Sequence, residues 1–456
     1  MGVLIEKKNG YDVISDVDKA EMERYCKEYI DFINAAKTER ECVNECVEIA
    51  EAHGFKPYKA GMELKPGDKV YYNNRGKNID LAVIGKKSMA FGVNIAAAHT
   101  DAPRLDLKPN PLYEDSELAY FKTHYYGGIK KYQWVTIPLE LHGVICKADG
   151  SKVEVKLGEG DEPKFVITDI LPHLGRRQAE KPMAEAIPGE NLNLLIGSVP
   201  VTDPEAKARY KQQVMELLNE KYGIIEEDLL SAELEAVPAF EASELGFDRS
   251  LIGAYGHDDR VCAFAEFKAL IDMEEIPERT AVCIFADKEE IGSMGVTGMR
   301  SEAFEHFMND MCKGQGVDLY DCFSKSFCLS ADVTAAMDPI YAEVFEKYND
   351  AKVNHGVGLF KYTGSRGKGG ASDASAETVA YLRKLFNDNG VLWQLTEMGK
   401  IDEGGGGTVA LYMANRNIET IDAGVPVLSM HAPYEVVSKL DCYMTYKGCK
   451  AVFEAK

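Results

Sequence analysis

The sequence lacks any long hydrophobic run: no stretch approaches the roughly 18 consecutive apolar residues typical of a membrane-spanning helix. Its first eight residues contain no apolar segment long enough to act as a signal peptide. It also lacks a basic excess, because 52 Lys and Arg against 74 Asp and Glu give a net charge of −22. That balance disfavours nucleic acid and anionic membranes as main partners. We therefore expect a cytoplasmic protein that binds neither.

The cysteines also lack a recognisable pattern. There are eleven of them without CxxC spacing, and a reducing cytoplasm suits such a set. Cys42 and Cys46 lie four apart on a predicted helix, but isolated buried thiols are far commoner than pairs. The glycine-rich residues 364–370 match neither the phosphate-loop spacing nor the dinucleotide fingerprint, which disfavours nucleotide binding.

The length of 456 residues is too great for one ordinary hydrophobic core, so two domains are expected. Strands alternate with helices in the first and last parts of the chain, which predicts an α/β fold with a mostly parallel central sheet flanked by helices. The middle differs, because segments such as Lys152–Leu157 alternate as half-buried antiparallel strands do. We predict that residues 1–104 and 247–456 form one discontinuous α/β domain and that residues 105–246 form a smaller, inserted β-rich domain.

Local signals place the elements. A capping box at residues 38–41 predicts the start of a helix that stops at Gly54. Further helices are predicted near residues 17–37, 259–274, 373–388 and 434–453. Strands are predicted near residues 68–73, 80–85, 91–98, 280–286, 326–331, 391–396, 408–413 and 424–429.

The adjacent carboxylates Glu289 and Glu290 follow the apolar run 279–286, which predicts a buried strand. Two acidic residues at such a place need compensation, unless they simply lie in a solvated loop. Neighbouring side chains on extended chain point in opposite directions, so the two are expected to have different tasks. One would bind a metal ion while the other handles a proton.

Potential metal ligands recur where other strands should end, which is the usual site edge of an open α/β sheet. Any one of them is more often structural, but five in such places are a rare coincidence. His99 is followed two residues later by Asp101, which would hold the other imidazole nitrogen, as is common at zinc. The five candidate ligands are His99, Asp258, Glu290, Asp332 and His431.

This set of histidines and carboxylates suits zinc, with cobalt or manganese as alternatives. Two divalent ions that share a bridging carboxylate need about this many ligands. We expect one ion on His99, Asp258 and Asp332. The other is expected on Asp258, Glu290 and His431, with Asp258 as the bridge.

Together these pieces resemble the M18 family of metallo-aminopeptidases, the group that contains aspartyl aminopeptidase. The resemblance rests on five short segments that span nearly the whole chain: residues 99–101, 258–259, 287–293, 330–332 and 430–431. It implies a two-metal exopeptidase that removes N-terminal residues from peptides. It also implies that the inserted domain builds dimers toward a dodecamer.

The resemblance further implies that His173 reaches a neighbouring subunit's active site, although a histidine in an ordinary turn is the alternative. The region around Lys361, expected to help read the substrate side chain, departs from the family pattern. Lys361, Arg366 and Lys368 would either pair an acidic group or form a solvated basic loop. Glycines 404–407 before Thr408 would allow substrate to approach the backbone closely, unless they form an inert turn.

The expected chemistry is peptide hydrolysis by a metal-bound water, since coordination lowers the pKa of water toward neutrality. Glu289 is suited to take the proton of that water and deliver it to the leaving nitrogen, while Glu290 binds metal. Two alternatives stay open at this point. One is another two-metal amide hydrolase, such as a carboxypeptidase or deacylase, and the other is a non-catalytic oligomeric carrier.

Overall fold

The structure, a computed structural model, describes Val3 and residues 8–456. Most of the N-terminal segment on which the signal-peptide expectation rests therefore lies outside the described residues. Contacts divide the chain into two compact units. Unit 1 comprises residues 1–101, 242–430 and 435–456, and unit 2 comprises residues 102–241 and 431–434. Whether each unit folds as a separate domain stays a prediction.

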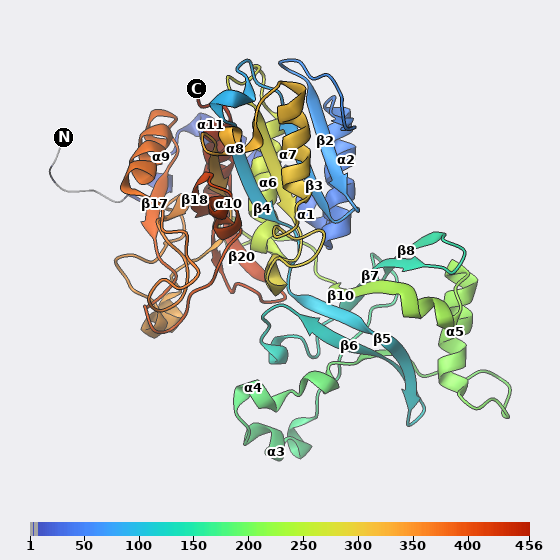
Figure 1. Cartoon of the computed structure of the whole chain (residues 1–456). Helices are drawn as coiled ribbons and strands as arrows, with labels where there is room; N and C mark the ends of the chain where they lie inside the picture. Colours follow the sequence, from blue (N-terminus) through green and yellow to red (C-terminus); the bar gives the residue numbers. More distant parts are fainter. Residues whose placement is uncertain (1–2, 4–7) are drawn as a thin grey trace. The chain divides into compact units, whose positions relative to one another are not determined.

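Unit 1 is built on a nine-stranded sheet (Figure 1). Its central strands are buried along nearly their whole length, because helices cover both faces. In sheet order the strands are β1 (Lys56–Pro57), β2 (Lys69–Asn74), β3 (Asn78–Val83), β13 (Ala281–Ala286), β4 (Asn94–His99), β14 (Phe327–Ser330), β18 (Glu419–Gly424), β16 (Val357–Phe360) and β17 (Trp393–Thr396).

The expectation of a mostly parallel sheet needs correction, because this sheet is mixed. The central strands β13, β4, β14 and β18 run parallel, but β2 and β3 pair antiparallel with each other, and β3 and β16 run antiparallel to the central strands. Only residues 75–77 connect β2 to β3. A connection that short permits only an antiparallel pair, since parallel strands need a crossover of a dozen or more residues.

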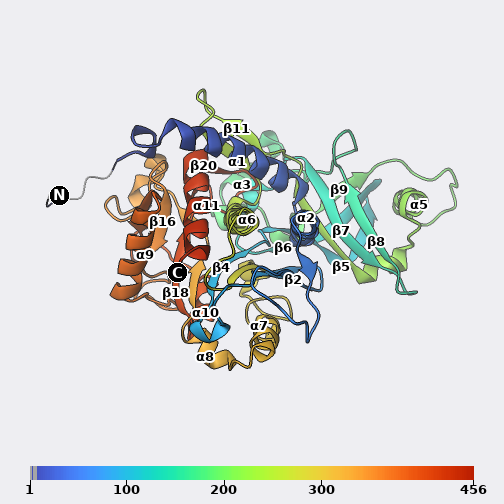
Figure 2. The ribbon, with the colours of Figure 1, turned by 90° about the horizontal axis from the view of Figure 1, so that it is seen from above.

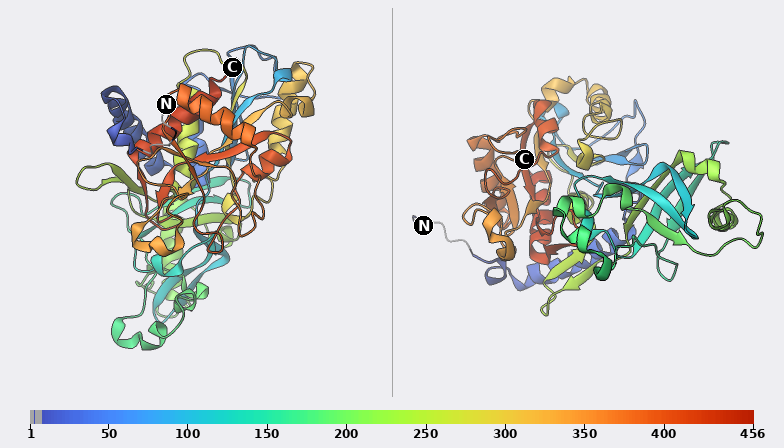
Figure 3. Two further views of the ribbon diagram at one scale, coloured as in Figure 1. Left: turned by 90° about the vertical axis from the view of Figure 1, so that its left-hand side faces the viewer. Right: turned by 90° about the horizontal axis from the view of Figure 1, so that it is seen from below.

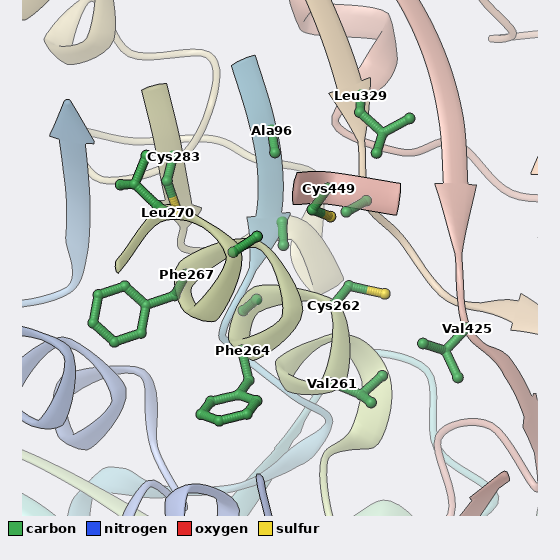
Figure 4. Close-up of a cluster of buried hydrophobic side chains, with 14 of the residues drawn as sticks. Ala96, Val261, Cys262, Phe264, Phe267, Leu270, Cys283, Leu329, Val425 and Cys449 are labelled. Atoms are coloured by element: carbon green, nitrogen blue, oxygen red, sulfur yellow. The ribbon is translucent and has the colours of Figure 1, made fainter. Parts of the chain in front are cut away.

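Helices lie on both faces of this sheet (Figures 2 and 3). Successive residues of β4 alternate between two hydrophobic clusters, with Ala96 and Ala98 in one and Ile95 and Ala97 in the other. Figure 4 shows Phe267, Leu270 and Cys283 among the buried side chains of the first cluster. The helices on that face are α1 (Asp16–Ala35), α2 (Glu39–Ala52), α6 (His257–Ile271), α9 (Ala376–Asp388) and α11 (Lys439–Phe453). The opposite face is covered by α7 (Ala303–Gly314), α8 (Leu319–Phe323) and α10 (Ala410–Asn415).

The predicted capping box is present at the start of α2. The Thr38 hydroxyl accepts a hydrogen bond from the Glu41 N–H, and the Glu41 carboxylate accepts one from the Thr38 N–H. The strand predicted over residues 408–413 is wrong, because this segment contributes to α10. Val409, Ala410 and Met413 are buried at helical spacing, and a short apolar run does not by itself distinguish a helix from a strand.

Unit 1 also contains a smaller five-stranded sheet. In order its strands are β11 (Ser243–Leu245), β12 (Leu251–Ala254), β20 (Glu435–Ser438), β19 (Pro426–Leu428) and β15 (Thr334–Ala335). Strand β12 leads directly into α6, and β20 leads into α11. The two strands pair antiparallel, with Ala254 opposite Glu435, so the end of β12 that leads into α6 lies beside the start of β20.

Unit 2 contains a six-stranded antiparallel sheet, in agreement with the alternating sequence pattern of this region. Its strands, in order, are β8 (Lys152–Leu157), β7 (Leu139–Cys146), β10 (Ala232–Pro238), β5 (Arg104–Asp115), β6 (Leu118–Tyr126) and β9 (Leu194–Gly197). The helices of this unit are α3 (Arg176–Ala179), α4 (Met183–Ala186) and α5 (Arg209–Tyr222).

The structure also bears on the hydrophobic runs and the cysteines of the sequence. Among the described residues, no helix has both the length and the apolar character needed to cross a membrane. All eleven cysteines lie in the described part of the chain, and all are free thiols.

Candidate metal centre

The carboxyl ends of three parallel strands define the candidate site in unit 1. In the strand register, His99 at the end of β4 lies opposite Ala286 at the end of β13, and Ala97 lies opposite Ser330 of β14. Asp332 therefore emerges at the same edge as His99 and the residues that follow β13. Parallel strands place their carboxyl ends together, so residues distant in sequence share one edge.

The turn before α6 adds two further carboxylates. Gly256 has φ +76°, a conformation that glycine adopts readily, and Asp258 and Asp259 depart from helical geometry. The Asp258 N–H donates a hydrogen bond to the Glu435 carboxylate over 3.0 Å. Burial lowers the pKa of the preceding His257 to about 3, with partial compensation from the Ile252 carbonyl, so this imidazole is neutral.

His99 is the centre of the site. Its Nε2 atom lies 3.2 Å from Asp258 Oδ1 and 3.9 Å from Glu289 Oε2. Among the described residues of unit 1, two groups offer ligand atoms that all lie within 4.8 Å of one another. Both groups contain His99. One adds Asp258 and Glu290, and the other adds Asp259 and Asp332.

The donor set fits divalent zinc, which binds imidazole nitrogen and carboxylate oxygen. The buried Asp259 supplies a second sign of fit, because its Oδ1 atom has no hydrogen-bond partner among the described residues. Buried polar atoms are rarely left in this state unless water or an ion satisfies them. The sequence pattern did not single out Asp259 as a ligand, although its position next to Asp258 was the available signal.

The crowding of buried carboxylates in this site raises the pKa of both Asp332 and His99. Burial raises the pKa of Asp332 well above its usual range, and the carboxylates of Asp259, Glu289 and Asp258 raise it further. For His99, burial lowers the pKa, but Asp101 and Asp258 outweigh this effect and raise it well above its usual value. A cation among these groups would relieve both shifts, since it favours ionised carboxylates and a neutral imidazole.

Asp101 contacts both His99 and the turn that carries Glu289 and Glu290. Its carboxylate oxygens accept hydrogen bonds from the backbone N–H groups of Glu289 (3.1 Å) and Glu290 (3.2 Å). The Nδ1 atom of His99 lies 3.0 Å from the Asp101 carbonyl oxygen and 3.4 Å from its Oδ1. One buried aspartate thus contacts both the imidazole and the turn that carries the paired glutamates.

The glutamate pair does not lie on extended chain, as the sequence reasoning assumed. Both residues belong to a 3₁₀ turn, η7 (Glu289–Ile291), which follows Lys288 at φ +65°. The turn nevertheless distinguishes them, because Glu290 belongs to a ligand group while Glu289 places Oε2 near the imidazole. Both are half-buried.

His431 belongs to unit 2 by its contacts. Its Nδ1 atom lies 2.8 Å from the Gly128 carbonyl oxygen, and its backbone has φ +63°. Neither ligand group formed by the described residues includes it. The assignment of His431 as a metal ligand therefore stays a prediction.

The three residues predicted to bind substrate have the following surroundings. His173 is exposed in the turn η4 (Pro172–Leu174) of unit 2. The Lys361 ammonium donates to the Asp373 carboxylate over 2.7 Å. The buried Thr408 hydroxyl donates to Asp422 over 2.7 Å. None of these contacts tests substrate binding.

Comparison with known proteins identifies the family of the chain. A family model described as "Aminopeptidase I zinc metalloprotease (M18)" matches residues 32–453. The chain belongs to the M18 family. It is 48% identical to a probable M18 family aminopeptidase 1 of Clostridium acetobutylicum, over 98% of each chain.

Solved structures of M18 proteins agree with this assignment. The M18 family aminopeptidase of Thermotoga maritima has a TM-score of 0.95 and 43% identity, covering 99% of this chain and 100% of that one. Aminopeptidase I of Clostridium acetobutylicum has a TM-score of 0.93 and 47% identity, with the same coverage. The chain is therefore an M18 aminopeptidase, a hydrolase that acts on peptides, and the family resemblance of the sequence motifs is confirmed.

Proposed function

We propose that this M18 aminopeptidase uses two divalent ions to remove N-terminal residues from peptides. The observation that carries the proposal is the pair of ligand groups around His99, one with Asp258 and Glu290 and the other with Asp259 and Asp332. A cocatalytic site needs ligands for two ions close together, and these two groups, which overlap at His99, gather five candidate ligands in one place. Zinc is the expected metal, with cobalt or manganese as alternatives.

The proposed ligand sets are those derived from the sequence, with one addition. His99 and Asp332 would hold one ion, Glu290 and His431 would hold the other, and Asp258 would be shared by both. Asp259 is an additional candidate beside Asp332. Asp258→Asn should reduce the content of both ions in elemental analysis, whereas Asp259→Asn should reduce one. Loss of a single ion from Asp258→Asn would contradict the bridge.

Divalent ions bound here would polarise the scissile carbonyl and make a water nucleophilic near neutral pH. Glu289 accepts the proton of the attacking water and then donates it to the leaving nitrogen. Asp101 holds the backbone of Glu289 and contacts the His99 ring, so it keeps the base in a fixed place relative to the ligands. Glu290, on the same turn, would act as a metal ligand and not as the base.

The test of the proton-transfer role is Glu289→Gln. It should retain the fold and the bound zinc but lower kcat by about 10²–10⁴, the usual effect of losing a general base. Glu302→Gln, at an exposed glutamate, is the matched control and should leave kcat unchanged. Near-normal turnover by Glu289→Gln would remove Glu289 from the mechanism. Activity lost to a chelator should return with Zn²⁺, Co²⁺ or Mn²⁺.

We also propose that the preferred N-terminal residue is not acidic. Lys361 and Lys368 both donate to the single carboxylate of Asp373, over 2.7 and 3.1 Å, so their charge is already partly compensated. Each of these lysines is therefore engaged with Asp373 and is less available to pair with an acidic substrate side chain. A panel of aminoacyl p-nitroanilides tests this, and faster turnover of aspartyl or glutamyl than of leucyl or lysyl substrates would contradict it.

Self-association through unit 2 is the remaining part of the proposal. Ile170, Leu171 and Leu174 are exposed around His173, and exposed apolar clusters often mark protein interfaces. The yeast protein mApe1, which shares the fold at 22% identity and a TM-score of 0.78, was solved as a dodecamer. Leu171→Glu should lower the mass measured by sedimentation, and an unchanged assembly would contradict a role for this segment. A cytoplasmic location stays a prediction.

A further inference from the structure

The turn that carries Asp258 and Asp259 needs support from outside α6. Asp258 (φ −78°, ψ 104°) and Asp259 (φ −119°, ψ 22°) both lie outside the helical region, so regular helix geometry does not hold them. Their carboxylates must nevertheless keep fixed places, because metal affinity depends on how firmly ligands are oriented. The Glu435 carboxylate, which accepts from the Asp258 N–H, supplies one support.

A second support comes from the residue before Asp258. His257 is fully buried, and both of its ring nitrogens have partners in unit 1. Its Nε2 atom lies 3.1 Å from the Ile252 carbonyl oxygen, and its Nδ1 atom lies 2.6 Å from the Tyr29 hydroxyl. A carbonyl oxygen only accepts hydrogen bonds, so Nε2 carries the proton. In a neutral ring Nδ1 is then an acceptor, and the Tyr29 hydroxyl is its donor.

These contacts link three elements to the metal-binding turn. Tyr29 lies on α1, Ile252 lies on β12, and His257 begins α6, one residue before Asp258. We propose that Tyr29 and His257 are positioning residues for the Asp258–Asp259 turn, in which the Tyr29–His257–Ile252 hydrogen bonds fix the backbone that presents the metal-binding carboxylates. This inference rests on the proposed metal-dependent function.

The same helix contains an internal comparison. Tyr25 lies one turn before Tyr29 on α1 and is also buried, and its ring contacts Phe264, Tyr443 and Tyr446. Its hydroxyl has no hydrogen-bond partner within the part of the chain that the structure describes. The two tyrosines therefore share helix, burial and a ring contact with Phe264, but only the Tyr29 hydroxyl contacts His257.

The experiment compares Tyr29→Phe with Tyr25→Phe in the full-length protein. Each change removes one hydroxyl and keeps the ring, so the core volume is nearly unchanged. Zinc affinity is measured on metal-free protein by competition with a chromophoric chelator. Tyr29→Phe should bind zinc about tenfold more weakly, in line with the effect of losing an outer-shell partner. Tyr25→Phe should match the wild type.

Two further readouts separate positioning from general stability. Saturating zinc should return the kcat of Tyr29→Phe to the wild-type value, because no group that contacts substrate has changed. In ¹⁵N spectra, the wild-type His257 should show a protonated Nε2 and a hydrogen-bonded Nδ1, and Tyr29→Phe should shift only the Nδ1 resonance.

The outcomes that contradict the inference differ from those that contradict the proposed function. If the wild type binds zinc and Tyr29→Phe binds it equally well, the positioning role is refuted. Equal weakening in Tyr25→Phe and Tyr29→Phe would also refute it, since the effect would then be general to the core. If the wild type itself neither binds zinc nor needs it for turnover, the metal-dependent function fails.

Discussion

The sharpest single test of the site is Asp101→Asn. The wild-type carboxylate accepts the Glu289 N–H on one oxygen and the Glu290 N–H on the other, and it is fully buried. Asparagine keeps one oxygen and replaces the other with an NH₂ group, which is a donor. At least one backbone N–H therefore loses its acceptor and faces another donor.

The size of the effect follows from those contacts. A hydrogen bond to a charged group contributes about 1.5–3 kcal/mol, and each 1.4 kcal/mol changes an equilibrium constant about tenfold. The lost contact holds the turn of Glu290, which belongs to the ligand group of His99. Zinc affinity should therefore fall roughly 10- to 100-fold, within the range known for outer-shell partners of metal ligands.

The assay is zinc competition on metal-free protein, with thermal unfolding of the same samples. The melting temperature of the metal-free variant should not fall greatly, because the substitution also removes a negative charge from an acidic cluster. Asp338→Asn is the matched control, since Asp338 caps a 3₁₀ turn by accepting from the Ile340 N–H over 2.9 Å and belongs to neither ligand group. Wild-type zinc affinity in Asp101→Asn would refute the reasoning.

Three further predictions concern stability and specificity. Burial raises the pKa of Asp80 to about 8, so the folded state keeps a proton that the unfolded chain loses near pH 4. The free energy of unfolding is therefore highest below about pH 4 and falls as the pH rises toward 8. Asp80→Asn should remove that contribution, and urea denaturation at pH 5 and pH 8 should then show a smaller decline than in the wild type. Thr38→Ala removes the side-chain acceptor of the α2 capping box and should lower the free energy of unfolding by about 1 kcal/mol, again measured in urea. Asp373→Asn frees Lys361 and should raise kcat/KM for glutamyl relative to leucyl p-nitroanilide, and an unchanged ratio would show that this loop does not read the substrate side chain.

Local sequence patterns predicted much of the fold because they report local physics. The capping box at Thr38 and the apolar runs of β4 and β13 depend on neighbouring residues alone. The segment at 408–413 failed for the same reason, because a short apolar run suits a strand or a helix equally until tertiary packing selects one. The antiparallel strands in the main sheet were missed because pairing direction depends on which strands become neighbours.

The sequence by itself determined the residue types of the candidate site and their positions after predicted strands. His99, Glu290 and Asp332 could be chosen in this way because burying an acidic or imidazole group beside an apolar run costs free energy unless a partner compensates it. Only the tertiary structure decided which of these groups meet. Asp101 contacts the Glu289 turn across 188 residues of sequence, and Tyr29 contacts His257 across 228. Contacts of that range depend on how strands and helices pack together, which the periodicity of a single segment does not encode.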